Sequence, residues 1–141
     1  MIMRTKVFAV ALMVTSFDAS AQDAWMQANE LRAAFNGRTV TGQHIDGSPF
    51  TATYAADGSI SYSQPEITTE GRWHIAKNEF CTFYEGLNGG CFLTRKIGEN
   101  CFQFYVTENQ ETGRLTPKEG TPYVSQVWYP ELKSTCEVLS G

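Results

Sequence analysis

The chain has 141 residues and is mildly acidic, with 11 Lys and Arg against 15 Asp and Glu. Such a surface repels phosphate backbones, so we expect no nucleic-acid partner. The length fits one domain with a modest core, and the 3 Trp, 6 Tyr and 9 Phe spread along it are typical of a small β domain.

Residues 1–21 have the pattern of a secretory signal peptide. Two basic residues precede an apolar run over 7–14, and small residues over 19–21 form a cleavage site. The run is shorter than the roughly 20 residues that a membrane-spanning helix needs. We therefore expect a secreted, periplasmic protein without a membrane span, in which 22–141 form a single domain. Cleavage removes two basic residues and one acidic residue, so that 9 and 14 remain and the net charge becomes −5.

A short amphipathic helix is predicted behind the cleavage site. Asp23 is a suitable N-cap, and Asn36-Gly37 is a typical stop signal. The apolar residues between them recur at intervals of three and four: Trp25, Ala28, Leu31 and Phe35. We expect this apolar face to pack against the β domain, either closing the end of a barrel or lying on one face of a sheet.

From residue 38 the periodicity changes to two, which is typical of strands with one buried face. The pattern predicts about eight strands in hairpin order, over 38–45, 49–56, 59–63, 71–75, 79–84, 91–97, 101–107 and 123–129. Asp46-Gly47 and Asp57-Gly58 mark two of the turns, because glycine tolerates the positive φ of tight hairpins. The predicted fold class is mainly β, an antiparallel up-and-down barrel or strongly curled sheet with one N-terminal helix. Periodicity alone does not decide whether the sheet closes.

The chain has four cysteines, an even number, and an exported chain meets an oxidising compartment, so we expect two disulfides. A metal or redox site is the rival hypothesis, but it is not supported because the chain has no CxxC motif. A hairpin that turns over 86–90 brings Cys81 opposite Cys91, at a separation that suits a bridge. That pairing leaves Cys101 and Cys136 to tie the C-terminal tail to the sheet.

Turn glycines and aromatic residues form five motifs: 36–42 (NGRTVTG), 46–50 (DGSPF), 54–58 (YAADG), 71–75 (GRWHI) and 80–81 (FC). Together they resemble a family of small secreted proteobacterial proteins, a domain of unknown function with a lipocalin-like antiparallel barrel. The resemblance covers about half of the mature chain and leaves out 108–141. It implies a secreted barrel-like domain and transfers no catalytic residue.

The sequence carries no catalytic motif, so we expect a protein that is not an enzyme and needs no cofactor. Nucleophilic hydrolysis needs a base beside Ser or Cys, yet the histidines are only His44 and His74, and no GxSxG occurs. The acidic residues lie mostly singly in turns, unlike the paired carboxylates of glycosidases. His44 and Asp46, joined by His74 if their strands approach, could offer metal ligands. No second ligand pair reinforces them, so no metal is expected.

Binding remains as the functional hypothesis, in the first form with a small apolar ligand. An eight-stranded barrel is either filled by side chains or open enough to hold one ligand. Seven aromatic residues could line an apolar cup or fill a core, and the small size of the domain favours the filled core. These residues are Phe50, Tyr54, Trp73, Phe83, Phe102, Phe104 and Trp128.

The alternative is a monomeric periplasmic protein inhibitor, for example of a cell-wall lytic enzyme. The polar stretch 108–122 is long for a structureless connection, and loops on a braced scaffold often carry recognition. The candidate contact residues are Arg114, Thr116, Lys118 and Glu119. A surface loop without a partner is the simpler interpretation of this stretch.

Overall fold

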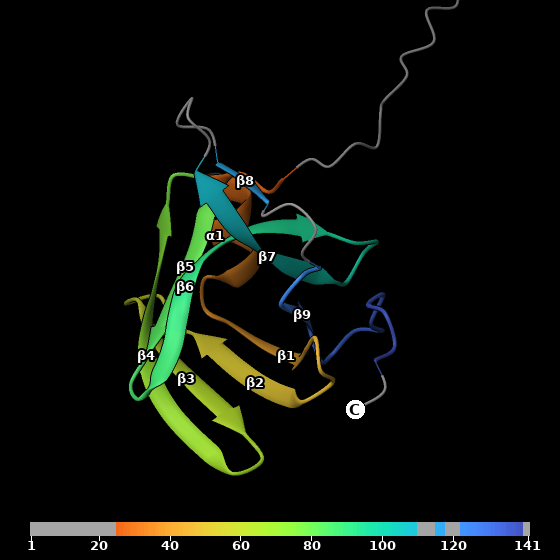
Figure 1. Cartoon of the computed structure of the whole chain (residues 1–141). Coiled ribbons are helices and arrows are strands. Elements are labelled where there is room, and N and C mark those ends of the chain that lie inside the picture. Colours follow the sequence, from red (N-terminus) through yellow and green to blue (C-terminus); the bar gives the residue numbers. More distant parts are fainter. Residues whose placement is uncertain (1–24, 110–114, 118–121, 140–141) are drawn as a thin grey trace, which may run out of the picture.

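The computed structural model describes residues 25–109, 115–117 and 122–139 (Figure 1). The expected mainly β fold with one short helix is confirmed in this part of the chain. The elements are α1 (Ala28–Phe35), β1 (Arg38–His44), β2 (Pro49–Tyr54), β3 (Ser59–Gln64), β4 (Ile67–Ala76), β5 (Glu79–Tyr84), β6 (Leu87–Lys96), β7 (Phe102–Asn109), β8 (Leu115–Pro117) and β9 (Ser125–Trp128). The predicted signal peptide over 1–21 and the predicted cap Asp23 lie outside the described residues.

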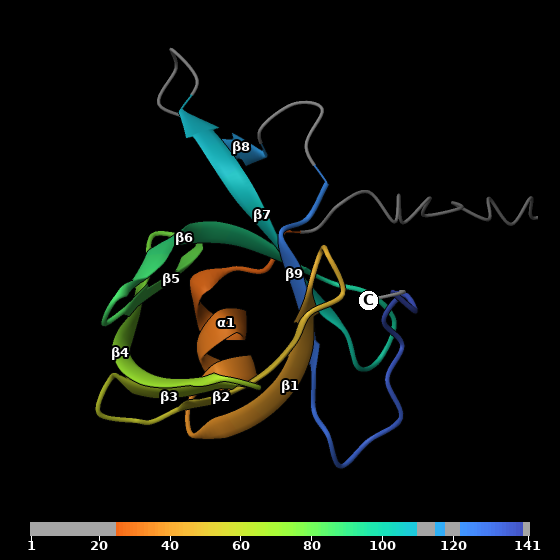
Figure 2. The same ribbon diagram turned by 60° about the horizontal axis from the view of Figure 1, so that its bottom comes forward.

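Eight of the strands close into an antiparallel barrel, which settles the choice that periodicity left open. β1 to β6 pair in chain order as a meander, and β7 then pairs with β6. The ring closes through β9, which pairs with the first residues of β7 and with β1, where Trp128 lies opposite Thr41. β8 pairs only with the far end of β7, which extends beyond the ring (Figure 2).

Two turns are shorter than the sequence suggested. No strand was predicted over 64–70, but β3 extends to Gln64 and β4 already begins at Ile67, so the connection at Pro65 is a tight turn. The expected turn over 86–90 is also wrong, since β6 begins at Leu87 and runs through the glycines. A Cβ on Gly89 would lie 2.0 Å from the Thr82 carbonyl oxygen, so this glycine serves the close approach of two strands at a register shift.

The helix lies inside the barrel and fills one end of it (Figure 2). It begins at Ala28, later than expected, because Gln27 has an extended backbone and the Met26 N–H donates to the Thr94 carbonyl at 2.8 Å. The Asn78 side chain accepts from the Ala28 N–H at 3.0 Å, so a residue of the β4–β5 turn caps the helix. The predicted stop is confirmed: Gly37 has φ +71° and directly precedes β1.

Phe35 is the centre of the core. It is completely buried, and its ring lies 4.7–5.8 Å from the rings of four residues on the barrel wall, Tyr54, Phe80, Phe102 and Phe104. Such tilted and edge-on contacts are favourable for aromatic rings. The helix therefore holds the wall strands β2, β5 and β7 through one side chain on its last turn.

Both expected disulfides form. Cys81 and Cys91 are directly opposed in β5 and β6, with a Cα separation of 4.0 Å, and Cys101–Cys136 has a Cα separation of 5.0 Å. Asn100, for which no sequence pattern predicted a role, also holds the C-terminal segment in place. Its buried side chain donates to the carbonyls of Tyr129, Leu132 and Lys133 and accepts from the Tyr129 N–H at 2.8 Å.

Candidate ligand cavity

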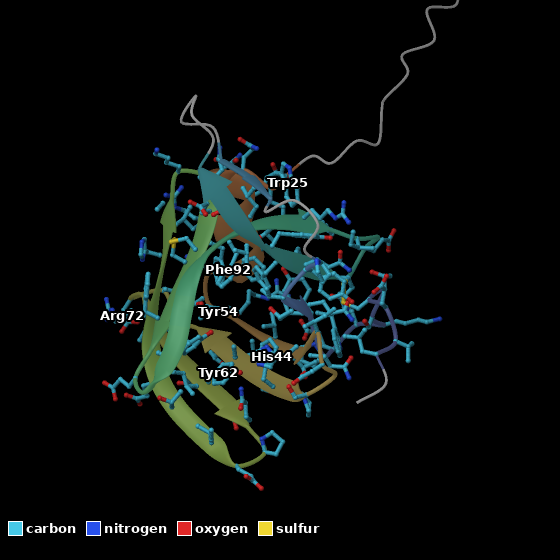
Figure 3. The ribbon with its side chains drawn as sticks, in the orientation of Figure 1. Trp25, His44, Tyr54, Tyr62, Arg72 and Phe92 are labelled. Atoms are coloured by element: carbon cyan, nitrogen blue, oxygen red, sulfur yellow. A yellow bond between two sulfur atoms is a disulfide. The ribbon has the colours of Figure 1, made fainter. Side chains whose placement is uncertain are left out.

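A cavity of about 380 Å³ occupies the half of the barrel that α1 leaves open. Its floor includes Tyr54, Phe80 and Phe104, whose rings contact Phe35 of the helix on their other side. Its mouth lies at the end of the barrel where β1 and β3 finish and β6 begins. Figure 3 shows the side chains of His44, Tyr54, Tyr62 and Phe92 gathered inside the barrel.

The wall of the cavity is mainly aromatic and aliphatic, as the alternation of the strands dictates. Along β2, Phe50, Ala52 and Tyr54 are buried while Thr51 is exposed. The apolar and aromatic residues that line the cavity are Phe50, Tyr54, Tyr62, Phe80, Tyr84, Leu87, Phe92, Phe104 and Val124. The Phe50 ring stacks on His44 at 4.6 Å and 29°, and on Tyr62 at 5.4 Å and 27°, so these three rings form one stack along one side of the cavity.

Three polar side chains form a network at the mouth. Gln64 Nε2 donates to the Tyr62 hydroxyl oxygen, which leaves the Tyr62 O–H to donate to His44 Nε2 at 2.8 Å. Burial lowers the pKa of His44, an effect that outweighs the nearby Asp46 carboxylate. His44 is therefore neutral near pH 7 and can accept this hydrogen bond.

Tyrosine hydroxyls supply the other polar groups. Burial raises the pKa of Tyr84 to about 12 and that of Tyr54 well above its usual value, so both stay protonated. The remaining polar lining residues are Thr82 and Ser125. The lining as a whole thus carries no formal charge near pH 7, although the protein has a net negative charge.

The structure divides the seven predicted lining residues into three groups. Phe50, Tyr54 and Phe104 line the cavity. Trp73 and Phe102 are buried in the core beside the helix instead, where Trp73 Nε1 donates to the Ala55 carbonyl at 2.8 Å. These two therefore belong to the part of the barrel that is filled.

The prediction was wrong for Phe83 and Trp128. Phe83 is 47% exposed and stacks on His74 at 5.8 Å and 13°, because Thr82 and Tyr84 take the inward positions of β5. Trp128 follows the inward-facing Val127 in β9 and does not line the cavity. In both cases the alternation of the strand outweighs the aromatic character of the side chain.

The sequence interpretation missed the polar rim and part of the wall. The missed lining residues are His44, Tyr62, Gln64, Phe80, Thr82, Tyr84, Leu87, Gly89, Phe92, Val124 and Ser125. Alternation in β3 and β5 could have identified Tyr62 and Tyr84 as inward-facing. His44 gave no such signal, because its partners come from β3, with β2 in between.

The two histidines do not come together. His44 lies inside the mouth, whereas His74 lies against Phe83, and β2 and β3 separate β1 from β4. Within the described residues, no group of three or more His, Cys, Asp and Glu could hold a metal ion. The candidate partner residues Arg114, Lys118 and Glu119 lie outside the described residues, and Thr116 is placed only by its backbone, opposite Glu108 in the β7–β8 pair.

Comparison with known proteins found no relative. No family model, curated protein or solved structure matches the chain. In the described ranges, no helix has the length and apolar character needed to cross a membrane. Function is therefore inferred from the geometry and chemistry of the cavity.

Proposed function

We propose that this protein is a secreted, non-catalytic binding protein that holds one small, mainly apolar ligand in the open half of its barrel. The observation that carries the proposal is the cavity of about 380 Å³, walled by aromatic rings and closed below by wall residues that pack on the helix. Small-molecule sites are commonly of this kind, with a concave apolar wall and a few convergent polar groups.

The contrast between the two halves of the barrel supports this proposal. One half is packed around Phe35, which is completely buried. In the other half, large apolar side chains face open space and forgo the dispersion contacts that a filled core would give them. A ligand that fills this space restores those contacts, and an eight-stranded barrel is wide enough to hold one.

Export is supported by two features. The pattern of 1–21 is that of a signal peptide, and disulfides such as Cys81–Cys91 and Cys101–Cys136 persist in oxidising compartments. A periplasmic location and membership of the proteobacterial family stay predictions. A non-catalytic role is favoured because His44, the histidine of the cavity, is engaged by Tyr62 rather than by a serine or cysteine.

Filling the mouth of the cavity tests this proposal. Leu87 is the first residue of β6 and lines the cavity, so Leu87→Trp places a larger ring where the ligand enters. We expect naphthalene, measured by NMR titration, to bind the wild-type protein with one-to-one stoichiometry. The variant should bind at least about tenfold more weakly, a loss of about 1.4 kcal/mol.

The matched control is Leu132→Trp, because Leu132 is 57% exposed and lies in the C-terminal segment outside the barrel. This variant should bind naphthalene as the wild type does, and circular dichroism should show that both variants are folded. Equal affinities of the Leu87 and Leu132 variants, or no binding to the wild type, would contradict a ligand site in the cavity.

A further inference from the structure

The Tyr54 side chain is held rigidly at the floor of the cavity. Its ring meets Phe35, Phe80 and Trp73 with centroid separations of 5.6, 5.1 and 6.0 Å, at interplanar angles of 75°, 90° and 67°. Only 2% of the residue is exposed, yet it lines the cavity. Three edge-on contacts therefore fix the direction in which its hydroxyl points.

The Tyr54 hydroxyl lacks a hydrogen-bond partner among the described residues. Other tyrosines of the domain differ: the hydroxyl of Tyr62 bonds His44, that of Tyr123 bonds Glu137, and that of Tyr129 bonds the Ala34 carbonyl. Because Tyr54 is almost entirely buried and lines the cavity, a ligand held there can supply the missing partner. Because the hydroxyl stays protonated, it can donate its hydrogen to an acceptor within the cavity.

The charge and polarity of the cavity restrict the ligand further. No lining residue is charged near pH 7, so an ionic ligand would lose its hydration without gaining a counter-charge. The rings of His44, Phe50 and Tyr62 form one stack with their faces turned toward one another, and the rest of the wall is mainly aromatic and aliphatic. An apolar ligand body fits such a wall better than a polar one does.

We infer that the ligand is a neutral, mainly apolar molecule with an acceptor oxygen, such as a carbonyl, that receives the hydrogen bond of the Tyr54 hydroxyl at the floor of the cavity. This inference rests on the proposed function and specifies its ligand class. It assigns Tyr54 as the residue that distinguishes an oxygen-bearing ligand from a hydrocarbon of similar shape.

Two probes and two variants test the inference. Naphthalene and 2-acetylnaphthalene share a flat ring system, but only the second carries a carbonyl. We expect Tyr54→Phe to weaken binding of the ketone about three- to tenfold, the range for loss of one neutral hydrogen bond, and to change the naphthalene affinity less than twofold. Tyr123→Phe removes a tyrosine hydroxyl outside the cavity and should leave both affinities unchanged.

The outcomes separate the inference from the proposed function. If the wild type binds naphthalene but Tyr54→Phe affects both probes equally or neither, the role of Tyr54 is overturned and the ligand cavity stands. If the wild type binds neither probe, the proposed function fails, and the inference fails with it. As a test of charge, 2-naphthoate should bind more weakly than the ketone at pH 7, and tighter binding would overturn the neutral ligand class.

Discussion

Replacing Phe35 by alanine should lower the free energy of unfolding by about 3–5 kcal/mol. Phe35 is completely buried, and its ring contacts Tyr54, Phe80, Phe102 and Phe104. Truncation removes these contacts and leaves a cavity between the helix and the barrel wall. The loss of stability therefore exceeds the free energy of transferring the ring from water into the core. Urea denaturation followed by circular dichroism, with the disulfides intact, measures the change.

The matched control for this prediction is Phe83→Ala. Phe83 is 47% exposed on the outer face, so the same substitution should cost less than about 1 kcal/mol. Two variants with similar losses would show that Phe35 is not the centre of the core. Because Tyr54, Phe80 and Phe104 also form the floor of the cavity, Phe35→Ala should weaken naphthalene binding as well.

The second large effect is expected from the disulfide of the C-terminal tail. Replacing Cys101 and Cys136 together by alanine removes a crosslink over a sequence separation of 35, whereas Cys81 and Cys91 are separated by only 10. The chain-entropy model then predicts losses of about 4 kcal/mol and about 3 kcal/mol, respectively. Urea denaturation of the two double-alanine variants gives both values under the same conditions.

The structure also gives a local reason why removal of Cys101–Cys136 should destabilise the protein more than removal of Cys81–Cys91. Cys81 and Cys91 lie on paired strands that the β5–β6 ladder already holds together, whereas Cys136 lies beyond the last strand. Without Cys101–Cys136 the tail depends on hydrogen bonds such as those of Asn100, so its amides should exchange faster with solvent. A larger loss for the Cys81–Cys91 pair, or unchanged exchange in the tail, would contradict this order.

Local signals predicted much of the fold. Alternation and the two Asp-Gly turns located the first hairpins, where Asp46 and Asp57 each accept hydrogen bonds from a serine two residues later. Closure was not predictable, because β9 joins both β1 and β7, which lie far apart in the sequence. The glycines at 89 and 90 were wrongly assigned to a turn. Gly89 is required by the close approach of β5 to β6, a contact between strands that the local sequence does not reveal.

The cavity was predictable only in part. Alternation tells which face a residue occupies, so Phe50 and Tyr54 were identified on the inward face of β2. It does not tell which end of the barrel the helix fills, and Trp73 therefore looked like a lining residue although it packs in the core. The His44–Tyr62 hydrogen bond joins strands that are not neighbours in the sheet, so no sequence pattern predicts it.

Native mass spectrometry of the wild-type protein, exported and purified without refolding, tests the central claim most directly. We predict a chain that lacks residues 1–21, is four hydrogens lighter because of its two disulfides, and carries one extra small neutral mass. The extra mass should be absent from the Leu87→Trp variant and present in Leu132→Trp. The bare processed chain in every preparation, or the same extra mass in all three proteins, would contradict a ligand held in the open half of the barrel.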